Sequence, residues 1–267
     1  MPEVRPPALL ARWLKLALIA LLVAAGAGLG YTRYKIASGY TPAARGERIA
    51  AKMGCFNCHG AGGEGGVANP SSNEKTVPGW TGGTAMIYIK APGELDEWVL
   101  DGKPKRVRES KEPPDDSPLI EMPAYRERLS PREHRNLMIY LRAVMALDIP
   151  DEKDKAAREG YLIAQKTGCF GCHGAAGRGV HANPRSLAGY IPAWEGPVYD
   201  DLVKNDKELQ EWIREGNTAR MKKNKFANYF IQRQVVAMPP YDGVLTDEEI
   251  ASVIAYIKWL RAQPTKE

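Results

Sequence analysis

The sequence has few cysteines and only one long uncharged run. Its 267 residues include four cysteines, and all four lie in two segments of five residues each. No second hydrophobic stretch approaches membrane length, which excludes several membrane spans and predicts that everything after Tyr34 lies in water. No part of the chain shows the alternation typical of a run of strands. These absences predict a mainly α-helical protein with a single membrane span.

The four cysteines belong to two C-x-x-C-H motifs, at residues 55–59 and 169–173. Two thiols at this spacing reach the two vinyl groups of one porphyrin, and the adjacent histidine is then carried onto the iron. A zinc ribbon or a disulfide pair also uses C-x-x-C, but a zinc ribbon places both pairs on one ion and needs no such histidine. The motifs therefore predict two covalently attached c-type haems and no disulfide scaffold. The predicted attachment residues are Cys55, Cys58, Cys169 and Cys172.

The two halves of the chain resemble each other well beyond these motifs. At a constant offset of 114 residues, Pro78 and Trp80 match Pro192 and Trp194, and residues 94–98 match residues 208–212. After a two-residue length difference, a Met-Pro-x-Tyr segment at 122–125 matches one at 238–241. A repeat of this extent indicates one domain written twice. We expect the first domain at residues 40–150 and the second at residues 151–267.

The N-terminal segment is the candidate membrane anchor. From Leu16 to Thr32 no residue is charged, and basic residues flank the run on both sides. This length is at the short end of what spans a hydrocarbon core of roughly 30 Å. A cleaved signal peptide is the alternative, because a basic start, an apolar stretch and small residues fit that pattern too. We expect a cytoplasmic N-terminus at 1–15 and a transmembrane anchor at 16–34.

Each half is predicted to be helical with long loops. Residues 43–54 and 156–168 form helices that lead into the motifs, and residues 94–101 and 208–215 form a middle helix. The last helices begin with capping boxes at Ser130 and Thr246, and apolar residues recur along them at helical spacing.

Each half resembles a class I cytochrome c domain, over about residues 40–147 and 155–262, and the whole chain resembles membrane-anchored dihaem c-type cytochromes. The resemblance implies a helical bundle whose first and last helices cross near a small and an aromatic residue. Those pairs are Gly46 with Tyr140 and Gly160 with Tyr256. It also implies that the haem domains lie on the periplasmic or outer side of a bacterial inner membrane, where such haems are attached.

In this family the motif histidine is the proximal iron ligand, and a late methionine, often followed by proline, is the distal ligand. The resemblance therefore implies axial pairs of His59 with Met122 and of His173 with Met238. Methionine is otherwise a common core filler. These two are the methionines in the matching Met-Pro-x-Tyr contexts, 63 and 65 residues after their histidines.

The same resemblance suggests residues around the ligands. Pro70 and Pro184 are expected to offer backbone carbonyls to the free ring nitrogens of the two motif histidines. An ordinary loop turn is the alternative for both prolines. Four residues are candidate partners of the haem propionates: Arg106, Arg220, Trp80 and Trp194. The alternative is that the arginines are solvated and the tryptophans are packed in the core.

An iron held by histidine and methionine has no open site for oxygen or peroxide, so the expected function is one-electron transfer. We expect a relay in a respiratory or photosynthetic chain, between a quinol-oxidising cytochrome bc-type complex and a soluble cytochrome or terminal oxidase, as a shuttle or a fixed subunit. The alternative is a dihaem redox enzyme such as a peroxidase or a thiosulfate-oxidising cytochrome. The matched methionines and the absence of a spare cysteine argue against it. A mainly architectural subunit is a third possibility.

Two charged segments precede the predicted methionine ligands. Residues 103–116 are basic at the start and acidic at the end, and residues 220–225 are basic. Both are typical of solvated loops. The alternative is an interaction surface for a redox partner, and nucleic-acid binding is not expected.

Overall fold

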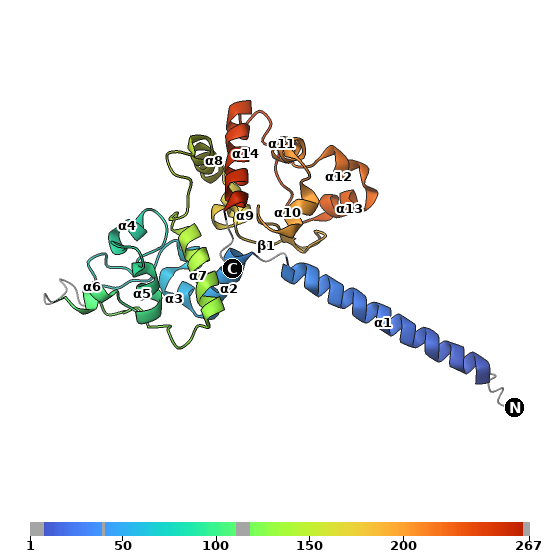
Figure 1. Cartoon of the computed structure of the whole chain (residues 1–267), viewed down its shortest axis with the longest axis horizontal. Helices are drawn as coiled ribbons and strands as arrows, with labels where there is room; N and C mark the ends of the chain where they lie inside the picture. Colours follow the sequence, from blue (N-terminus) through green and yellow to red (C-terminus); the bar gives the residue numbers. More distant parts are fainter. Residues whose placement is uncertain (1–7, 39–40, 111–117, 264–267) are drawn as a thin grey trace. The chain divides into compact units, whose positions relative to one another are not determined.

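The computed structural model describes residues 8–38, 41–110 and 118–263 (Figure 1). The chain divides into two units, Met1–Gly39 and Tyr40–Glu267. In the first unit, α1 (Ala8–Ser38) is one continuous helix. Its segment Arg12–Gly30 has a mean hydropathy of 1.9, and none of it is buried. This length and composition suit a membrane span or a signal sequence.

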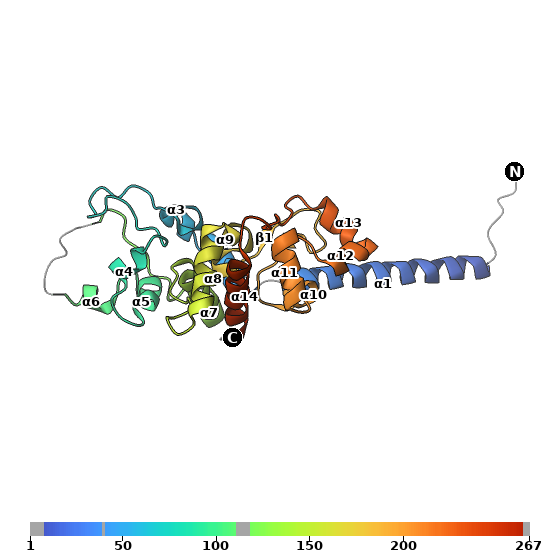
Figure 2. The same cartoon turned by 90° about the horizontal axis from the view of Figure 1, so that it is seen from above.

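The second unit contains the two repeated halves, which are mainly helical as the sequence predicts (Figure 2). The elements of the first half are α2 (Pro42–Lys52), α3 (Cys55–His59), η1 (Ala61–Gly63), α4 (Thr84–Tyr88), α5 (Glu94–Asp101), α6 (Lys105–Arg108) and α7 (Pro131–Val144). The elements of the second half are α8 (Lys155–Lys166), α9 (Cys169–His173), η2 (Ala175–Gly177), β1 (His181–Ala182), β2 (Tyr190–Ile191), α10 (Pro197–Leu202), α11 (Asp206–Glu215), α12 (Ala219–Lys223), α13 (Lys225–Arg233) and α14 (Asp247–Ala262).

Each half is built on one helix crossing, α2 against α7 and α8 against α14. A Cβ added at Gly46 would lie 2.1 Å from the carbonyl oxygen of Asn136, and one at Gly160 would lie 1.9 Å from that of Ser252. The first crossing also meets Tyr140, as expected, with its Cβ 2.6 Å from the added atom. At Gly160 the nearest atoms belong to the α14 backbone one turn before Tyr256. Backbone thus meets backbone at both crossings, which only glycine permits.

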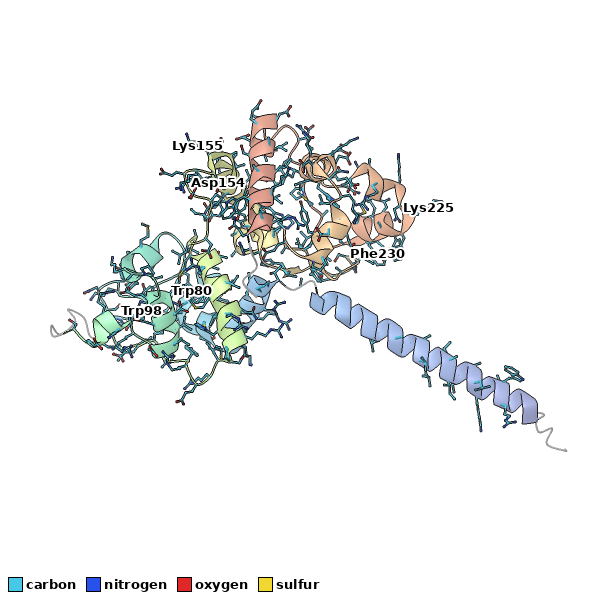
Figure 3. All side chains as sticks on the ribbon, in the orientation of Figure 1. Trp80, Trp98, Asp154, Lys155, Lys225 and Phe230 are labelled. Atoms are coloured by element: carbon cyan, nitrogen blue, oxygen red, sulfur yellow. The ribbon has the colours of Figure 1, made fainter. Side chains whose placement is uncertain are left out.

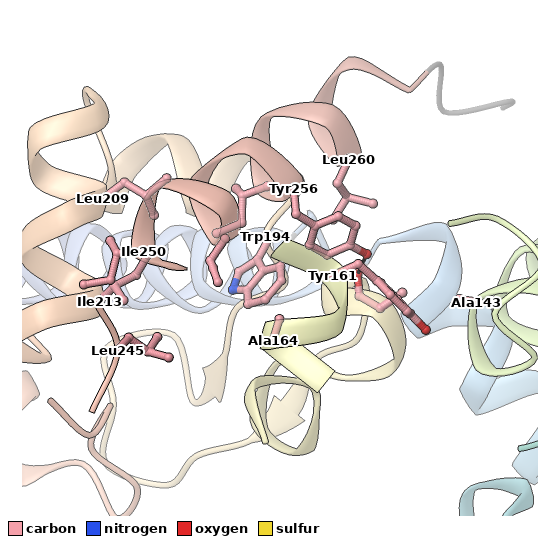
Figure 4. Packing of buried hydrophobic residues seen from close by; sticks show 13 residues of the cluster. Ala143, Tyr161, Ala164, Trp194, Leu209, Ile213, Leu245, Ile250, Tyr256 and Leu260 are labelled. Atoms are coloured by element: carbon pink, nitrogen blue, oxygen red, sulfur yellow. Dashed lines mark hydrogen bonds between the residues drawn. The ribbon is translucent and has the colours of Figure 1, made fainter. Parts of the chain in front are cut away.

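Each half has its own cluster of buried side chains. The first gathers α2, α5 and α7 around Trp80. The second gathers α8, α11 and α14 around Trp194, Tyr161 and Tyr256 (Figure 4). Ala143 of α7 belongs to the second cluster, so the end of the first half packs into the core of the second.

The predicted capping boxes begin α7 and α14. The Ser130 hydroxyl accepts from the Glu133 amide, and the Glu133 carboxylate accepts from the Ser130 amide at 3.1 Å and its hydroxyl at 2.8 Å. Thr246 and Glu249 repeat the arrangement. The hydrogen bonds from Ser130 have the largest effect on the pKa of Glu133, and the hydrogen bond from Lys52 adds to it. Together they lower this pKa to about 2.

We expect Ser130→Ala to lower the free energy of unfolding by about 1 kcal/mol near neutral pH, because α7 loses its N-cap. The loss should shrink as the pH falls. Glu133 has a lowered folded-state pKa, so its contribution is present above an ordinary glutamate pKa and disappears as the pH drops from there toward about 2. Urea titrations at several pH values measure both effects. An equal loss at every pH would contradict the role given to Glu133.

Candidate haem-binding sites

The motif helices α3 and α9 end in tight turns. Gly60 and Gly174 follow the two histidines with φ of 78° and 73°. A Cβ at Gly60 would lie 1.7 Å from the Gly65 carbonyl oxygen, and one at Gly174 would lie 2.2 Å from the Gly179 Cα. The chain therefore folds back directly after each motif, where only glycine fits. This turn fixes the direction in which each histidine leaves its helix.

The rings of both motif histidines are held by a backbone carbonyl. Nδ1 of His59 lies 2.7 Å from the Pro78 oxygen, and Nδ1 of His173 lies 2.8 Å from the Pro192 oxygen. A carbonyl only accepts, so Nδ1 carries the proton and donates. Nε2 is left as the free nitrogen, which is the arrangement expected of a metal-binding imidazole.

The sequence-based assignment of these carbonyls to Pro70 and Pro184 is wrong. The Pro70 oxygen accepts from Lys75 Nζ at 3.1 Å, and the Pro184 oxygen accepts from the Val235 amide at 3.1 Å. The loop after each motif is a hairpin, closed by the Ala68–Thr76 bridge in the first half and by β1 and β2 in the second. Its returning arm brings the later proline, and not the first one, back beside the histidine.

Burial acts on the charge of both imidazoles. It lowers the pKa of His59 and of His173, while the proline carbonyls act in the opposite direction with a smaller effect. Burial thus disfavours the imidazolium form, which has no lone pair for a metal. The neutral ring with a free Nε2 is the form that binds iron.

A tryptophan packs beside each histidine. The ring centroids of Trp80 and His59 are 5.0 Å apart, and those of Trp194 and His173 are 5.2 Å apart. Both tryptophans are buried, and their amides donate to the carbonyls of Gly63 and Gly177. The structure thus gives Trp80 and Trp194 a packing role next to the motif histidines. Their contact with propionates stays a prediction.

The Met-Pro-x-Tyr segments pack against the same clusters as the motifs. Met122 lies against the first cluster, as do Cys55 and Phe56, and Met238 lies against the second. The Tyr125 amide donates to the Val99 carbonyl at 3.1 Å, and the matching Tyr241 amide donates to that of Ile213 at 3.0 Å.

A buried asparagine, for which the sequence predicted no role, ties each methionine segment to the hairpin after the motif. Asn69 Nδ2 donates to the Ile120 carbonyl at 3.0 Å, and its Oδ1 accepts from the Ile120 amide at 3.1 Å. Asn183 makes the same two bonds to Val236, both at 2.9 Å. In each half the hydrogen-bonded residue stands two positions before the methionine. The Ala-Asn-Pro triplet at residues 68–70, repeated at residues 182–184, was the sequence signal that could have indicated this asparagine clamp.

Both candidate propionate arginines are engaged by glutamates. Arg106 Nε donates to Glu94 at 2.9 Å, and Arg220 Nε donates to Glu208 at 2.7 Å. The hydrogen bond from each arginine lowers the pKa of its glutamate. These ion pairs join the middle helix to the segment that follows it. The contact of both arginines with propionates stays a prediction.

Arg220→Gln should lower the thermal midpoint, because Glu208 is nearly enclosed and would lose its charged partner. The fall in the thermal midpoint should be largest near neutral pH and shrink as the pH drops through the ordinary glutamate range. The pKa of Glu208 is lowered in the folded state, so its ion pair stabilises the fold only while the carboxylate is ionised. Calorimetry checks this, with the exposed Arg233→Gln as the control. A reduction potential shifted by Arg220→Gln at unchanged stability would instead favour a propionate contact.

Each site therefore offers two thiols on one short helix, one oriented imidazole and one thioether. Within residues 8–38, 41–110 and 118–263, no three His, Cys, Asp or Glu side chains are grouped so that they could hold a metal ion directly. A zinc site has no support in that part of the chain. The donors instead fit a porphyrin-bound iron attached through the thiols.

A small helical domain with this donor set defines a haem-binding electron-transfer module. A sequence model of the family described as Cytochrome c matches residues 43–144 and 157–261. The chain therefore belongs to the cytochrome c family and contains two copies of its domain. Membership implies covalently attached c-type haem, and the C-x-x-C spacing is present in both copies.

One curated relative is cytochrome c oxidase subunit 2 of Alkalihalophilus pseudofirmus, which is 24% identical over 125 residues. The match covers 44% of this chain and 29% of that protein. The chain thus spans less than a third of its relative. No solved structure matches the chain significantly.

Proposed function

We propose that the protein is a membrane-tethered dihaem cytochrome that relays single electrons. The observation that carries this is the duplicated site, in which a carbonyl-held imidazole, a C-x-x-C helix and a clamped methionine segment recur in both halves. Bound haem supplies a centre that cycles between ferric and ferrous states. The chain's residues attach it, orient its ligands and exclude other reactants.

The proposed ligand roles are the same in both halves. Cys55 and Cys58, like Cys169 and Cys172, would form the thioether attachments. His59 and His173 would be the proximal ligands through Nε2, and Met122 and Met238 would be the distal ligands. Irons held in this way would have no open position for peroxide or nitrite, which disfavours the enzyme alternative.

Contacts between the halves support transfer within one chain. Ala143 packs in the second core, and α7 contacts η2, which directly follows the second motif helix. The Thr41 hydroxyl donates to the Arg178 carbonyl in the second half. The halves thus form one unit, as an internal relay requires.

The tether is α1, placed in a bacterial inner membrane with both haem domains on the outer side. Its 19-residue apolar segment supports a span, and a cleaved signal sequence is the competing possibility. The partners proposed are a quinol-oxidising cytochrome bc-type complex as donor and a soluble cytochrome or terminal oxidase as acceptor. The similarity to a protein named cytochrome c oxidase subunit 2 favours the oxidase side.

Mild detergent extraction of native membranes, followed by native electrophoresis with haem staining and mass spectrometry, tests this proposal. We expect the intact chain in the membrane fraction, either alone or together with oxidase or cytochrome bc subunits. Migration with those subunits identifies a fixed subunit, and migration alone identifies a tethered shuttle. A haem-stained chain that lacks its first residues and stays in the soluble fraction would contradict the tether.

A further inference from the structure

The two halves differ most in the segment before the distal methionine. Residues 102–125 of the first half contain five basic and five acidic residues. The matching residues 216–241 contain five basic residues and no acidic one. The first half has Pro113, Pro114, Asp115 and Asp116 where the second half has an aromatic helix. The two copies therefore share the predicted ligand residues but differ in charge and in aromatic content before the distal methionine.

The helix at this place is α13, and it contributes no buried residue to the fold. Phe226 is 64% exposed and Tyr229 is 55% exposed, and both rings contact Phe230, with centroids 5.1 Å and 5.3 Å away. The Arg233 guanidinium lies over the Tyr229 ring at 5.2 Å. Figure 3 shows Lys225 and Phe230 on this helix. Three aromatic rings at helical spacing thus form an apolar surface that the core does not use.

Cationic side chains border this surface. Lys222 is paired with Glu215, and Arg220 is paired with Glu208. Lys223 and Lys225 are exposed and form no ion pair with any residue that the structure describes. An amphipathic helix with exposed aromatics beside unpaired lysines is typical of segments that lie in the headgroup region of an anionic membrane.

The first described residue of the second unit packs against the second half. Thr41 donates to the Arg178 carbonyl, and its methyl group lies 4.0 Å from where a Cβ at Gly196 would be. The start of the unit is therefore held against the second half, which carries α13.

We propose that α12 and α13 bind the anionic headgroups of the membrane that holds α1. Phe226, Tyr229 and Phe230 enter the interface, and Lys223 and Lys225 meet lipid phosphates. The second domain then stays at the membrane surface, while the first, with no net charge in the matching segment, remains available to protein partners. This inference rests on the proposed anchoring by α1. An acidic protein surface on α13 is the competing occupant.

The test uses the full haem-loaded chain in lipid nanodiscs. Because the native cysteines are assigned to haem attachment, an introduced cysteine is the single reactive thiol. Phe226→Cys is labelled with an uncharged polyethylene-glycol maleimide, and mass spectrometry follows the rate. Leu162→Cys, on the exposed face of α8, is the matched control.

We expect labelling at position 226 to be at least tenfold slower in discs with phosphatidylglycerol than in discs of phosphatidylcholine alone, with no change at position 162. Adding Lys223→Glu and Lys225→Glu should restore fast labelling, and an unchanged haem absorption spectrum shows that the variant is folded. Equal rates at position 226 in both lipids would overturn the inference and leave the protein surface as the occupant. A chain that does not enter nanodiscs at all would overturn the anchor first, and with it this inference.

Discussion

Gly160→Ala should lower the free energy of unfolding of the second domain by about 3 kcal/mol or more. The added Cβ would lie 1.9 Å from the Ser252 oxygen and 2.4 Å from the Ser252 carbonyl carbon. Both atoms belong to the α14 backbone, which cannot rotate away as a side chain can, so α8 and α14 must separate. The separation would disturb the cluster around Tyr256. Urea unfolding, followed by haem absorption and by circular dichroism, measures the loss.

Gly171→Ala is the matched control. A Cβ at Gly171 meets no atom within 4 Å, and the backbone there is helical. The first half has Asn57 at the equivalent position, which shows that a side chain is tolerated inside the motif helix. Alanine at this position should therefore be neutral or stabilise by up to about 1 kcal/mol. If Gly160→Ala were as stable as Gly171→Ala, the close helix crossing would be wrong.

Met238→Ala should lower the reduction potential of the second haem and open its distal side to carbon monoxide. Methionine ligation raises the potential, and axial ligands set haem potentials over a range of about 0.8 V. Met122→Ala should do the same to the first haem and leave the second unchanged. Spectroelectrochemical titration and carbon monoxide difference spectra of the reduced protein measure both effects.

Met221→Leu is the control for a purely structural methionine. Met221 is buried, and the sequence places it outside the Met-Pro-x-Tyr contexts. This substitution should change stability slightly and leave both potentials in place. A Met238→Ala protein with native potentials and no carbon monoxide binding would show that another side chain is the distal ligand.

The sequence predicted the helices best where the pattern of apolar residues was strong. The middle helix was expected at 94–101 and lies at Glu94–Asp101, and both capping boxes begin the helices they were expected to begin. The short helices α12 and α13 were missed. The basic run there is typical of a loop, and the apolar pattern of Phe226, Tyr229 and Phe230 in α13 covers only about one helical turn, too short to predict a helix.

The covalent part of the site was predictable because the motif spacing is set by the porphyrin. The carbonyl partners of the histidines were not, because the hairpin that follows each motif decides which proline returns to the ring. Pro78 stands 19 residues after His59, and the pairing of Ala68 with Thr76, together with the bond from the Trp80 amide to the Gly63 carbonyl, brings it there. The role of Asn69 was hidden for the same reason, since its partner Ile120 lies 51 residues away.

A redox titration of the purified full-length chain, monitored by absorption and repeated under carbon monoxide, distinguishes a two-centre relay with saturated irons from other haem proteins. We expect two electrons per chain, taken up in one-electron steps by two haems, and no change of the reduced spectrum when carbon monoxide is added. A single haem per chain, or a reduced haem that binds carbon monoxide in the native protein, would contradict a two-centre relay with saturated irons.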